Sequence, residues 1–191
     1  MALVRPQIVA LGDSLTSGHG IGELRSFPSI LQSRIDAEGF DYSVVNAGVS
    51  RNTSSHALQR LETALAGDVR ILIVAVGAND GLRRVAVAQL NQNLTRIIET
   101  AQSRRIAVIL CAMEALPIYG RNYVTSFRAV YDDLAARFRI PLVPFVMTNI
   151  LGNRRLVLPD QVHPNAEGAR MIADTIWPHL QPLLKRVRVA R

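Results

Sequence analysis

The stretch VALGDSLTSGHG, residues 9–20, sets an apolar run directly against a Gly-Asp-Ser turn and a glycine-rich loop. A short apolar run bounded by turn residues is typical of a buried β-strand. Two further runs, RILIVAV at 70–76 and RIAVIL at 105–110, are continuous in the same way. Strands that are covered on both faces have this composition, so the three runs predict the centre of a parallel sheet.

Helix-like stretches alternate with the apolar runs along the chain. We expect strands at 7–11, 42–47, 69–76, 106–112 and 142–145. Apolar residues recur at helical spacing in five other stretches, near 24–38, 54–66, 87–104, 122–138 and 165–184. Parallel strands need long crossover connections, and helices supply them on the faces of the sheet. The pattern predicts an α/β sandwich in which residues 1–191 form one domain.

The composition limits the class of protein and the partners. Hydrophobic residues make up 49% of the 191 residues, which excludes a disordered chain, and no apolar run is long enough to span a membrane. The net charge is +7, but the arginines are scattered and few aromatic residues lie among them, so we expect no nucleic-acid partner. The segment KRVRVAR at 185–191 predicts a flexible basic tail. Cys111 lies in an apolar run, which predicts a buried free thiol.

The first residues lead straight into the first expected strand and carry no secretory leader. We therefore expect a cytoplasmic protein without a stable membrane anchor. If a leader has been removed from the sequence, a periplasmic or secreted protein is the alternative. The oligomeric state is left open by the sequence.

Small and polar residues follow three of the expected strands at the point where each one ends. Ser14 follows the first strand, Gly48 in NAGVS follows the second, and Asn79 in GAND follows the third. Each one alone is typical of an ordinary turn, because Gly, Asn, Asp and Ser favour turn conformations. The carboxyl ends of parallel strands meet at one edge of a sheet, and ligands bind in the crevice outside it. Together, a hydroxyl, a glycine backbone and an amide are parts of an acyl-transfer site.

A general base for such a site is predicted at His163. It lies in LPDQVHPNAEG, residues 158–168, just before the last expected helix and three residues after Asp160. A carboxylate at that spacing can fix the imidazole tautomer and stabilise the imidazolium. His19, His56 and His179 are interpreted as solvated or packing residues, and Asp13 as a structural residue that ties the turn beside Ser14.

These motifs resemble the conserved blocks of the GDSL, or SGNH, hydrolase family. GDSL at 12–15 is similar to the first block, Gly48 in NAGVS to the second, GAND at 77–80 to the third and DQVH at 160–163 to the fifth. The order and spacing of the blocks match as well, and the similarity covers almost the whole chain. LPIYGRNYVTSF at 116–127 resembles the multifunctional bacterial thioesterase, arylesterase and lysophospholipase branch.

The resemblance implies a flavodoxin-like three-layer α/β/α sandwich with a five-stranded parallel sheet. It also implies a bacterial serine esterase that needs no metal and no cofactor. Ser14 matches the family's nucleophile, His163 its base and Asp160 the acid that orients the base. The oxyanion hole would be formed by the Ser14 N–H, the Gly48 N–H and the Asn79 amide.

The predicted activity is hydrolysis of short- to medium-chain acyl or aryl esters, and of thioesters, through an acyl-enzyme on Ser14. Carbohydrate O-deacetylation and lysophospholipase activity are the alternatives within the family. A nucleotide-binding flavodoxin-like module and a catalytically inactive relative are the alternatives outside it. Four residues are candidates for an apolar wall along the acyl chain, with ordinary loop packing as the other interpretation: Leu82, Pro117, Ile118 and Tyr119.

One segment departs from the resemblance. The second block in this branch often continues with Gly-Asp-Thr, and here it reads Arg51-Asn52-Thr53. An arginine replaces a flexible glycine, and an amide replaces a carboxylate. No catalytic group is lost, but the loop beside Gly48 is expected to differ in shape and to bring a cation near the site.

Overall fold

The structure, a computed structural model, describes the backbone of residues 5–189 and the side chains of residues 5–185. Five strands form one sheet in the order β2-β1-β3-β4-β5, and every neighbouring pair is parallel. The strands are β1 (Gln7–Gly12), β2 (Ser43–Gly48), β3 (Val69–Ala75), β4 (Ala107–Cys111) and β5 (Leu142–Val143). The predicted five-stranded parallel sheet is therefore confirmed.

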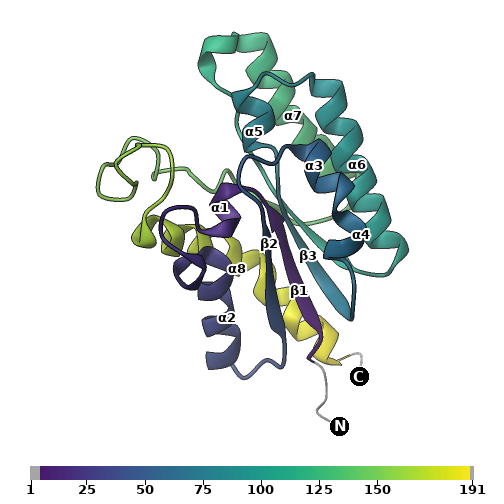
Figure 1. The fold of residues 1–191 in the computed structure, drawn as a ribbon. Helices are drawn as coiled ribbons and strands as arrows, with labels where there is room; N and C mark the ends of the chain where they lie inside the picture. The colour runs from purple at the N-terminus through teal and green to yellow at the C-terminus, as the bar shows by residue number, and fades with distance from the viewer. Residues whose placement is uncertain (1–4, 190–191) are drawn as a thin grey trace.

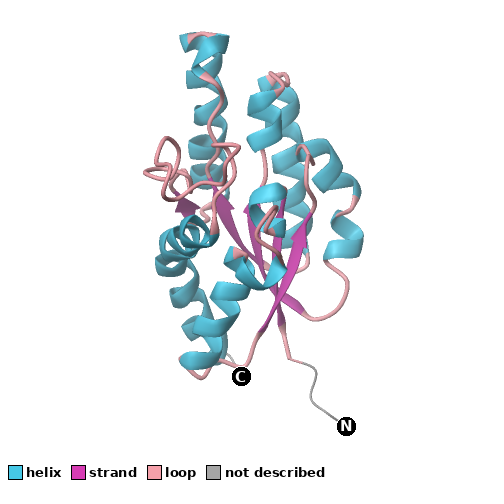
Figure 2. Ribbon diagram, turned by 60° about the vertical axis from the view of Figure 1, so that its left-hand side comes forward, coloured by secondary structure: helices cyan, strands magenta, loops and turns pink. Residues whose placement is uncertain are grey.

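Helices cover both faces of the sheet (Figures 1 and 2). On one face α2 (Phe27–Ala37) packs against the long C-terminal helix α8 (Ala166–Val189). On the other face α6 (Val87–Ser103) lies between α3 (Ser54–Gln59) and α7 (Arg121–Phe138), with α4 (Leu61–Ala64) following α3. The three-layer α/β/α sandwich predicted from the sequence is thus confirmed.

Three short helical segments were not predicted from the sequence: α1 (Ser14–Ser17), α5 (Ala78–Leu82) and the 3₁₀ turn η2 (Pro117–Tyr119). Each of them follows the carboxyl end of a strand: α1 follows β1, α5 follows β3 and η2 follows β4. They are too short to show a helical period, yet they carry many of the side chains at the edge where the site is expected. A further 3₁₀ turn, η1 (Glu23–Arg25), stands at the start of the helix expected near 24–38 and is separated from α2 at Ser26.

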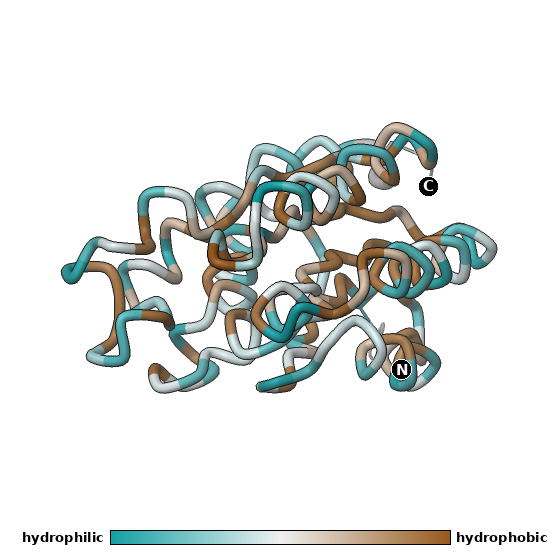
Figure 3. Tube along the Cα trace, turned by 90° about the horizontal axis from the view of Figure 1, so that it is seen from above, coloured by the Kyte–Doolittle hydropathy of each residue, from teal (hydrophilic) through white to brown (hydrophobic). Residues whose placement is uncertain are grey.

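The core lies between the sheet and the helices. The central strand β3 is fully buried from Ile71 to Val74, as its continuous apolar sequence predicted. Helix α6 buries one stripe, with Leu90, Leu94 and Ile97 inaccessible to solvent, and presents polar residues outward. Figure 3 shows the hydrophobic segments running through the middle of the molecule. Cys111 is a buried free thiol, as expected, and burial raises its pKa to about 12.

The C-terminal end differs from the expectation. Helix α8 continues to Val189, so the backbone of residues 185–189 is helical where the sequence predicted a flexible tail. Residues 190–191 of that predicted tail lie outside the described residues. Within the described part of the chain, no helix combines the length and the hydropathy that crossing a membrane requires.

Candidate active site

The strand β1 delivers Ser14 to the carboxyl edge of the sheet through a tight turn. Asp13 caps the short helix α1, and its Oδ1 accepts a hydrogen bond from the Leu15 N–H at 3.0 Å. Ser14 is consequently the first residue of α1 and is half-buried. A Cβ at Gly12 would lie 1.8 Å from the Thr16 hydroxyl and 3.0 Å from the Ala75 carbonyl, so only glycine fits before the turn.

His163 reaches Ser14 from the other end of the chain. The segment between β5 and α8 passes beside α1 (Figure 1) and brings His163 Nε2 within 3.1 Å of Ser14 Oγ. The backbone of this loop is pinned by the Leu158 N–H, which donates to the His163 carbonyl at 2.8 Å. The imidazole is thereby placed in hydrogen-bonding contact with a hydroxyl 149 residues away in sequence.

Asp160 holds the other side of the imidazole. Its Oδ2 lies 2.6 Å from His163 Nδ1, and its Oδ1 accepts the backbone N–H groups of Val162 and His163 at 2.9 and 3.0 Å. The His163 backbone N–H, its ring and the Val162 N–H together hold the pKa of Asp160 well below its usual range. A carboxylate in this position stays ionised and can stabilise an imidazolium.

Gly48 and Asn79 lie at the ends of the two strands that flank β1. Gly48 pairs in register with Gly12, and a Cβ there would lie 2.3 Å from the Ser17 backbone nitrogen. Asn79 stands in α5 and lines the same cavity as Ser14. The structure thus brings the carboxyl ends of β1, β2 and β3 together, as expected from the parallel sheet.

Two of the three predicted oxyanion donors are already hydrogen-bonded to the protein. The Gly48 N–H donates to Asn46 Oδ1 at 3.0 Å. The Asn79 amide nitrogen donates to the Asn52 carbonyl at 3.0 Å and to Asp13 Oδ2 at 3.3 Å. A substrate oxyanion therefore has to compete with these partners for the same hydrogens.

Asp13 takes part in more than the turn that the sequence suggested. It is 1% exposed, and burial raises its pKa to about 6. The Arg60 guanidinium lies close enough to interact with Asp13 electrostatically, and it donates to the Gly12 carbonyl at 2.7 Å and to Asn52 Oδ1 at 2.8 Å. Arg60 thereby ties the Ser14 turn to the loop after β2. Arg60 was not predicted as a site residue, because it carries no motif signal of its own.

A cavity of about 520 Å³ opens beside Ser14, His163 and Asn79. Of the four predicted wall residues, Leu82 and Pro117 line it. Ile118 and Tyr119 do not, which corrects that part of the prediction. The Ile118 side chain is 83% exposed, and the Tyr119 hydroxyl instead donates to the Leu82 carbonyl at 2.6 Å.

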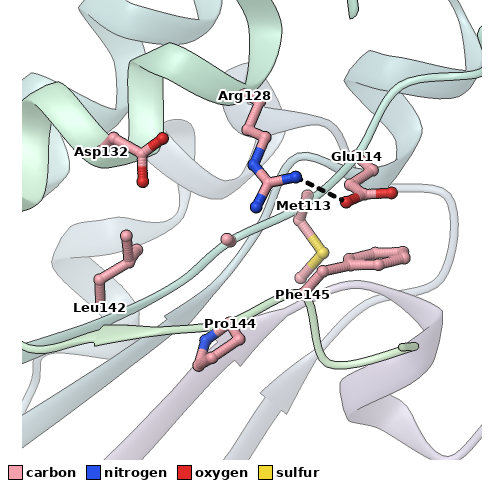
Figure 4. A pocket seen from close by; sticks show the side chains of 8 residues that line it. Met113, Glu114, Arg128, Asp132, Leu142, Pro144 and Phe145 are labelled. Carbon is pink, nitrogen blue, oxygen red and sulfur yellow. Dashed lines mark ion pairs between the residues drawn. The ribbon is translucent and has the colours of Figure 1, made fainter. Parts of the chain in front are cut away.

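Most of the apolar lining was not predicted. It comes from the segments after β4 and β5 and from α7, with Ala115, Leu116, Val124, Phe145, Met147 and Leu151. Part of this lining belongs to the apolar segment PFVMTNIL at 144–151, which the sequence alone does not distinguish from the end of an ordinary buried strand. A smaller cavity of about 190 Å³ shares Glu114 and Phe145 with this one, and there Glu114 faces Arg128 (Figure 4).

His19, predicted to be a solvated residue, lies beside the catalytic candidates instead. Its ring packs against the ring of His163 with the centroids 4.4 Å apart, and it lines the cavity. Among the described residues, one ligand atom each from His19, Asp160 and His163 lie within 4.8 Å of one another. Two imidazoles and a carboxylate are ligands that suit Zn²⁺. This group can hold a transition metal only at the expense of the contact between Asp160 and His163 or between His163 and Ser14.

Comparisons with known proteins identify the family of the chain. The chain is 36% identical to Esterase TesA of Pseudomonas aeruginosa over 178 residues, which span 93% of this chain and 89% of that protein. It is 33% identical to Thioesterase 1/protease 1/lysophospholipase L1 of Escherichia coli strain K12, over 93% of this chain and 84% of that protein. The crystal structure of esterase EstA from Pseudoalteromonas sp., inhibited by monoethylphosphonate, superposes with a TM-score of 0.87 at 29% identity, covering 94% of this chain and 98% of that one. Residues 10–171 match the model of the GDSL-like lipase/acylhydrolase family, and the chain belongs to that family.

Proposed function

We propose that this protein is a serine acylhydrolase of carboxylic esters and thioesters, with Ser14 as nucleophile, His163 as general base and Asp160 as orienting acid. The observation that carries the proposal is the continuous chain of contacts from Ser14 Oγ to His163 Nε2 (3.1 Å) and from His163 Nδ1 to Asp160 Oδ2 (2.6 Å). These contacts lie at the carboxyl end of β1, where Ser14 and His163 line a cavity. Nucleophile, base and orienter in hydrogen-bonding sequence are the signature of an activated serine.

The first chemical step is attack of Ser14 Oγ on the substrate carbonyl carbon. His163 Nε2 takes the hydroxyl proton as the bond forms, because a free serine hydroxyl is a weak nucleophile near neutral pH. Asp160 remains ionised, accepts the Nδ1–H and favours the imidazolium that results. The tetrahedral intermediate then collapses, and His163 protonates the departing alcohol or thiol. Water activated by the same imidazole releases the acid from the acyl-enzyme.

The oxyanion of the tetrahedral intermediate would be stabilised by the N–H groups of Ser14 and Gly48 and by the Asn79 amide. Donors placed where charge develops act in a site that largely excludes water, where they are worth more than in bulk solvent. The amide nitrogen of Asn79 makes its longer hydrogen bond to Asp13, at 3.3 Å, and its shorter one to the Asn52 carbonyl, at 3.0 Å. We expect the contact to Asp13 to be the one that is exchanged for the oxyanion.

The cavity supports substrates with short to medium acyl chains. Its volume of about 520 Å³ and its mainly apolar lining suit a chain of several carbons rather than a polar acyl group. The names of two relatives agree with ester and thioester hydrolysis: one is called an esterase, and another a thioesterase and lysophospholipase. One structural neighbour is an esterase that is inhibited by monoethylphosphonate, which agrees with ester hydrolysis as the proposed activity.

The test compares wild type with Ser14→Ala and with the control Ser17→Ala. Ser17 lies in the same short helix, and its hydroxyl hydrogen-bonds to the Ser14 carbonyl at 3.3 Å and to the Ser50 hydroxyl at 3.4 Å, whereas His163 Nε2 contacts the Ser14 hydroxyl. The assays are hydrolysis of 4-nitrophenyl esters of graded chain length, hydrolysis of a butyryl thioester, and labelling by a fluorophosphonate probe. We expect Ser14→Ala to lose turnover and labelling on every substrate, while Ser17→Ala keeps labelling. Equal turnover by Ser14→Ala and wild type would exclude Ser14 as the nucleophile.

A further inference from the structure

Arg51 adopts a backbone conformation that is unusual for an arginine. Its φ is 67°, in the left-handed region that glycine favours. The conformation is held by the Arg83 guanidinium, which donates to the Arg51 carbonyl at 3.1 Å, and by the Asn52 N–H, which donates to the Val49 carbonyl at 3.2 Å. Strain of this kind persists where the surrounding structure imposes it, and it collects at functional sites.

The left-handed turn places Arg51 in the wall of the cavity that contains Ser14. Ser50 and Arg51 follow β2, the edge strand beside β1, and both line the cavity. The apolar lining comes mostly from the segments after β4 and β5, on the other side of β1 and β3, with Ala115, Leu116, Pro117, Phe145, Met147 and Leu151. The sheet order therefore gives the cavity a cationic end and an apolar end, with Ser14 between them.

Arg51 lines this cavity, and among the described side chains no carboxylate lies within ion-pair distance of it. The neighbouring Arg83, which donates to the Arg51 carbonyl, forms no such ion pair either and interacts electrostatically with Asp80. Within the part of the chain that the structure describes, the one acidic residue that lines the cavity is Glu114, in the segment after β4. Its carboxylate points toward Arg128, 3.6 Å away in the adjoining smaller cavity (Figure 4). The cationic end is thus free to bind an anion.

We propose that Arg51 is a specificity-determining residue that selects esters whose leaving group carries a carboxylate or a phosphate a few bonds from the scissile oxygen. This inference rests on the proposed function. The acyl chain occupies the apolar end, so the leaving group lies toward Arg51. Hydrolysis breaks the bond between the carbonyl carbon and the ester oxygen. The leaving alcohol takes a proton from His163, and water then releases the acyl group from Ser14 as the free acid. Arg51 takes no part in the proton transfers and acts by binding the anion.

The test uses pairs of substrates that differ only in the charge of the leaving group. One pair is 4-acetoxybenzoate and its neutral methyl ester. The other pair is 1-butyrylglycerol 3-phosphate and neutral 1-butyrylglycerol. The measured quantity is the ratio of kcat/KM for the anionic substrate to that for its neutral partner, at low and at high salt.

The variants are Arg51→Gly, Arg51→Lys and the control Arg96→Gln. Glycine adopts a φ of 67° without strain, so Arg51→Gly removes the charge and keeps the loop. Arg51→Lys keeps a charge at the same place. Arg96 is an exposed arginine on α6 that does not line the cavity.

We expect Arg51→Gly to lower the ratio by roughly three- to five-fold, mainly through KM of the anionic substrate, as for an exposed ion pair. Arg51→Lys should restore most of it, high salt should lower the wild-type ratio, and Arg96→Gln should leave it unchanged. A ratio that does not change in Arg51→Gly for either pair would overturn the inference. If Arg51→Gly lowers the ratio for one substrate pair alone, Arg51 selects the anion of that pair, and selection of the other anion is excluded. Failure of the wild type to hydrolyse even the neutral esters would instead refute the proposed function.

Discussion

Replacement of Asp13 by Asn should change the pH dependence of stability in a direction that the structure specifies. Asp13 is 1% exposed, and burial raises its pKa from 3.8 to about 6. Between these two values the folded protein binds a proton that the unfolded chain has already lost. The free energy of unfolding of the wild type must therefore fall as the pH rises through this window. An Asn at this position has no proton to lose, so the variant lacks this contribution.

The size of the effect follows from the shift. A pKa raised from 3.8 to about 6 stabilises the folded protein at low pH relative to high pH. For one such group, linkage gives a loss of about 1.4 kcal/mol between pH 5 and pH 8. We expect the difference between wild type and Asp13→Asn to move by about this amount, against the wild type, over that interval. The absolute offset between the two proteins is set by other contacts, such as the amide group that Asn presents to Asn79.

The assay is urea unfolding of both proteins at pH 5, 6, 7 and 8, with Glu99→Gln as control. Glu99 is an exposed carboxylate on α6 whose partner is Arg137 at the surface. Loss of such an exposed charge should leave the pH dependence parallel to that of wild type from pH 5 to pH 8. Parallel curves for wild type and Asp13→Asn would refute the assignment of a buried, titrating carboxyl to position 13.

Three further changes test the site. Asn79→Ala should lower kcat by roughly 10²- to 10³-fold with little change in KM, as expected for loss of one oxyanion donor; an unchanged kcat would remove Asn79 from that role. Gly48→Ala should lower Tm by about 3–10 °C, because a Cβ would lie 2.3 Å from the Ser17 backbone nitrogen; a melting curve like that of wild type would show that the two segments separate easily. Micromolar Zn²⁺, but not Mg²⁺, should inhibit ester hydrolysis reversibly through the group around His19, and His19→Phe should become insensitive; equal inhibition of both proteins would exclude that group.

The fold could be predicted from the sequence to within a few residues, because burial on both faces leaves a strong signal. The run at 70–76 became β3, Val69–Ala75, and the helical period at 87–104 became α6, Val87–Ser103. The strand expected at 142–145 is shorter, since only Leu142 and Val143 pair with β4. The helix expected at 54–66 is divided at Arg60, whose side chain turns to the Gly12 carbonyl and to Asn52.

The candidate site could be predicted only where one residue type is needed for chemistry or for close approach. Gly48 is required by the backbone of Ser17, and His163 and Asp160 stand at a spacing that one short loop can close. Contacts made by residues of common type left no such signal. His19 looks like any histidine of a glycine-rich loop until the fold places its ring 4.4 Å from that of His163. Ile118 and Tyr119 were predicted as lining residues because they are apolar, but Ile118 is exposed to solvent and the Tyr119 hydroxyl is hydrogen-bonded to the Leu82 carbonyl.

The side-chain amide of Asn79 is hydrogen-bonded to Asp13, a residue that titrates, and it is also the proposed donor to the oxyanion. Its nitrogen has two hydrogens, and the structure directs both to oxygens of the protein, Asn52 and Asp13. The Asn52 contact is shorter, and Arg60 holds that residue by a hydrogen bond of 2.8 Å, so this hydrogen stays in place and fixes the amide plane. We expect the hydrogen directed to Asp13 to be the one that an oxyanion takes. An ionised Asp13 would then lose one hydrogen-bond partner at a position where it is only 1% exposed, whereas a protonated Asp13 loses less. We therefore expect the protonation state of Asp13 to affect how strongly the protein competes with the substrate for the Asn79 amide.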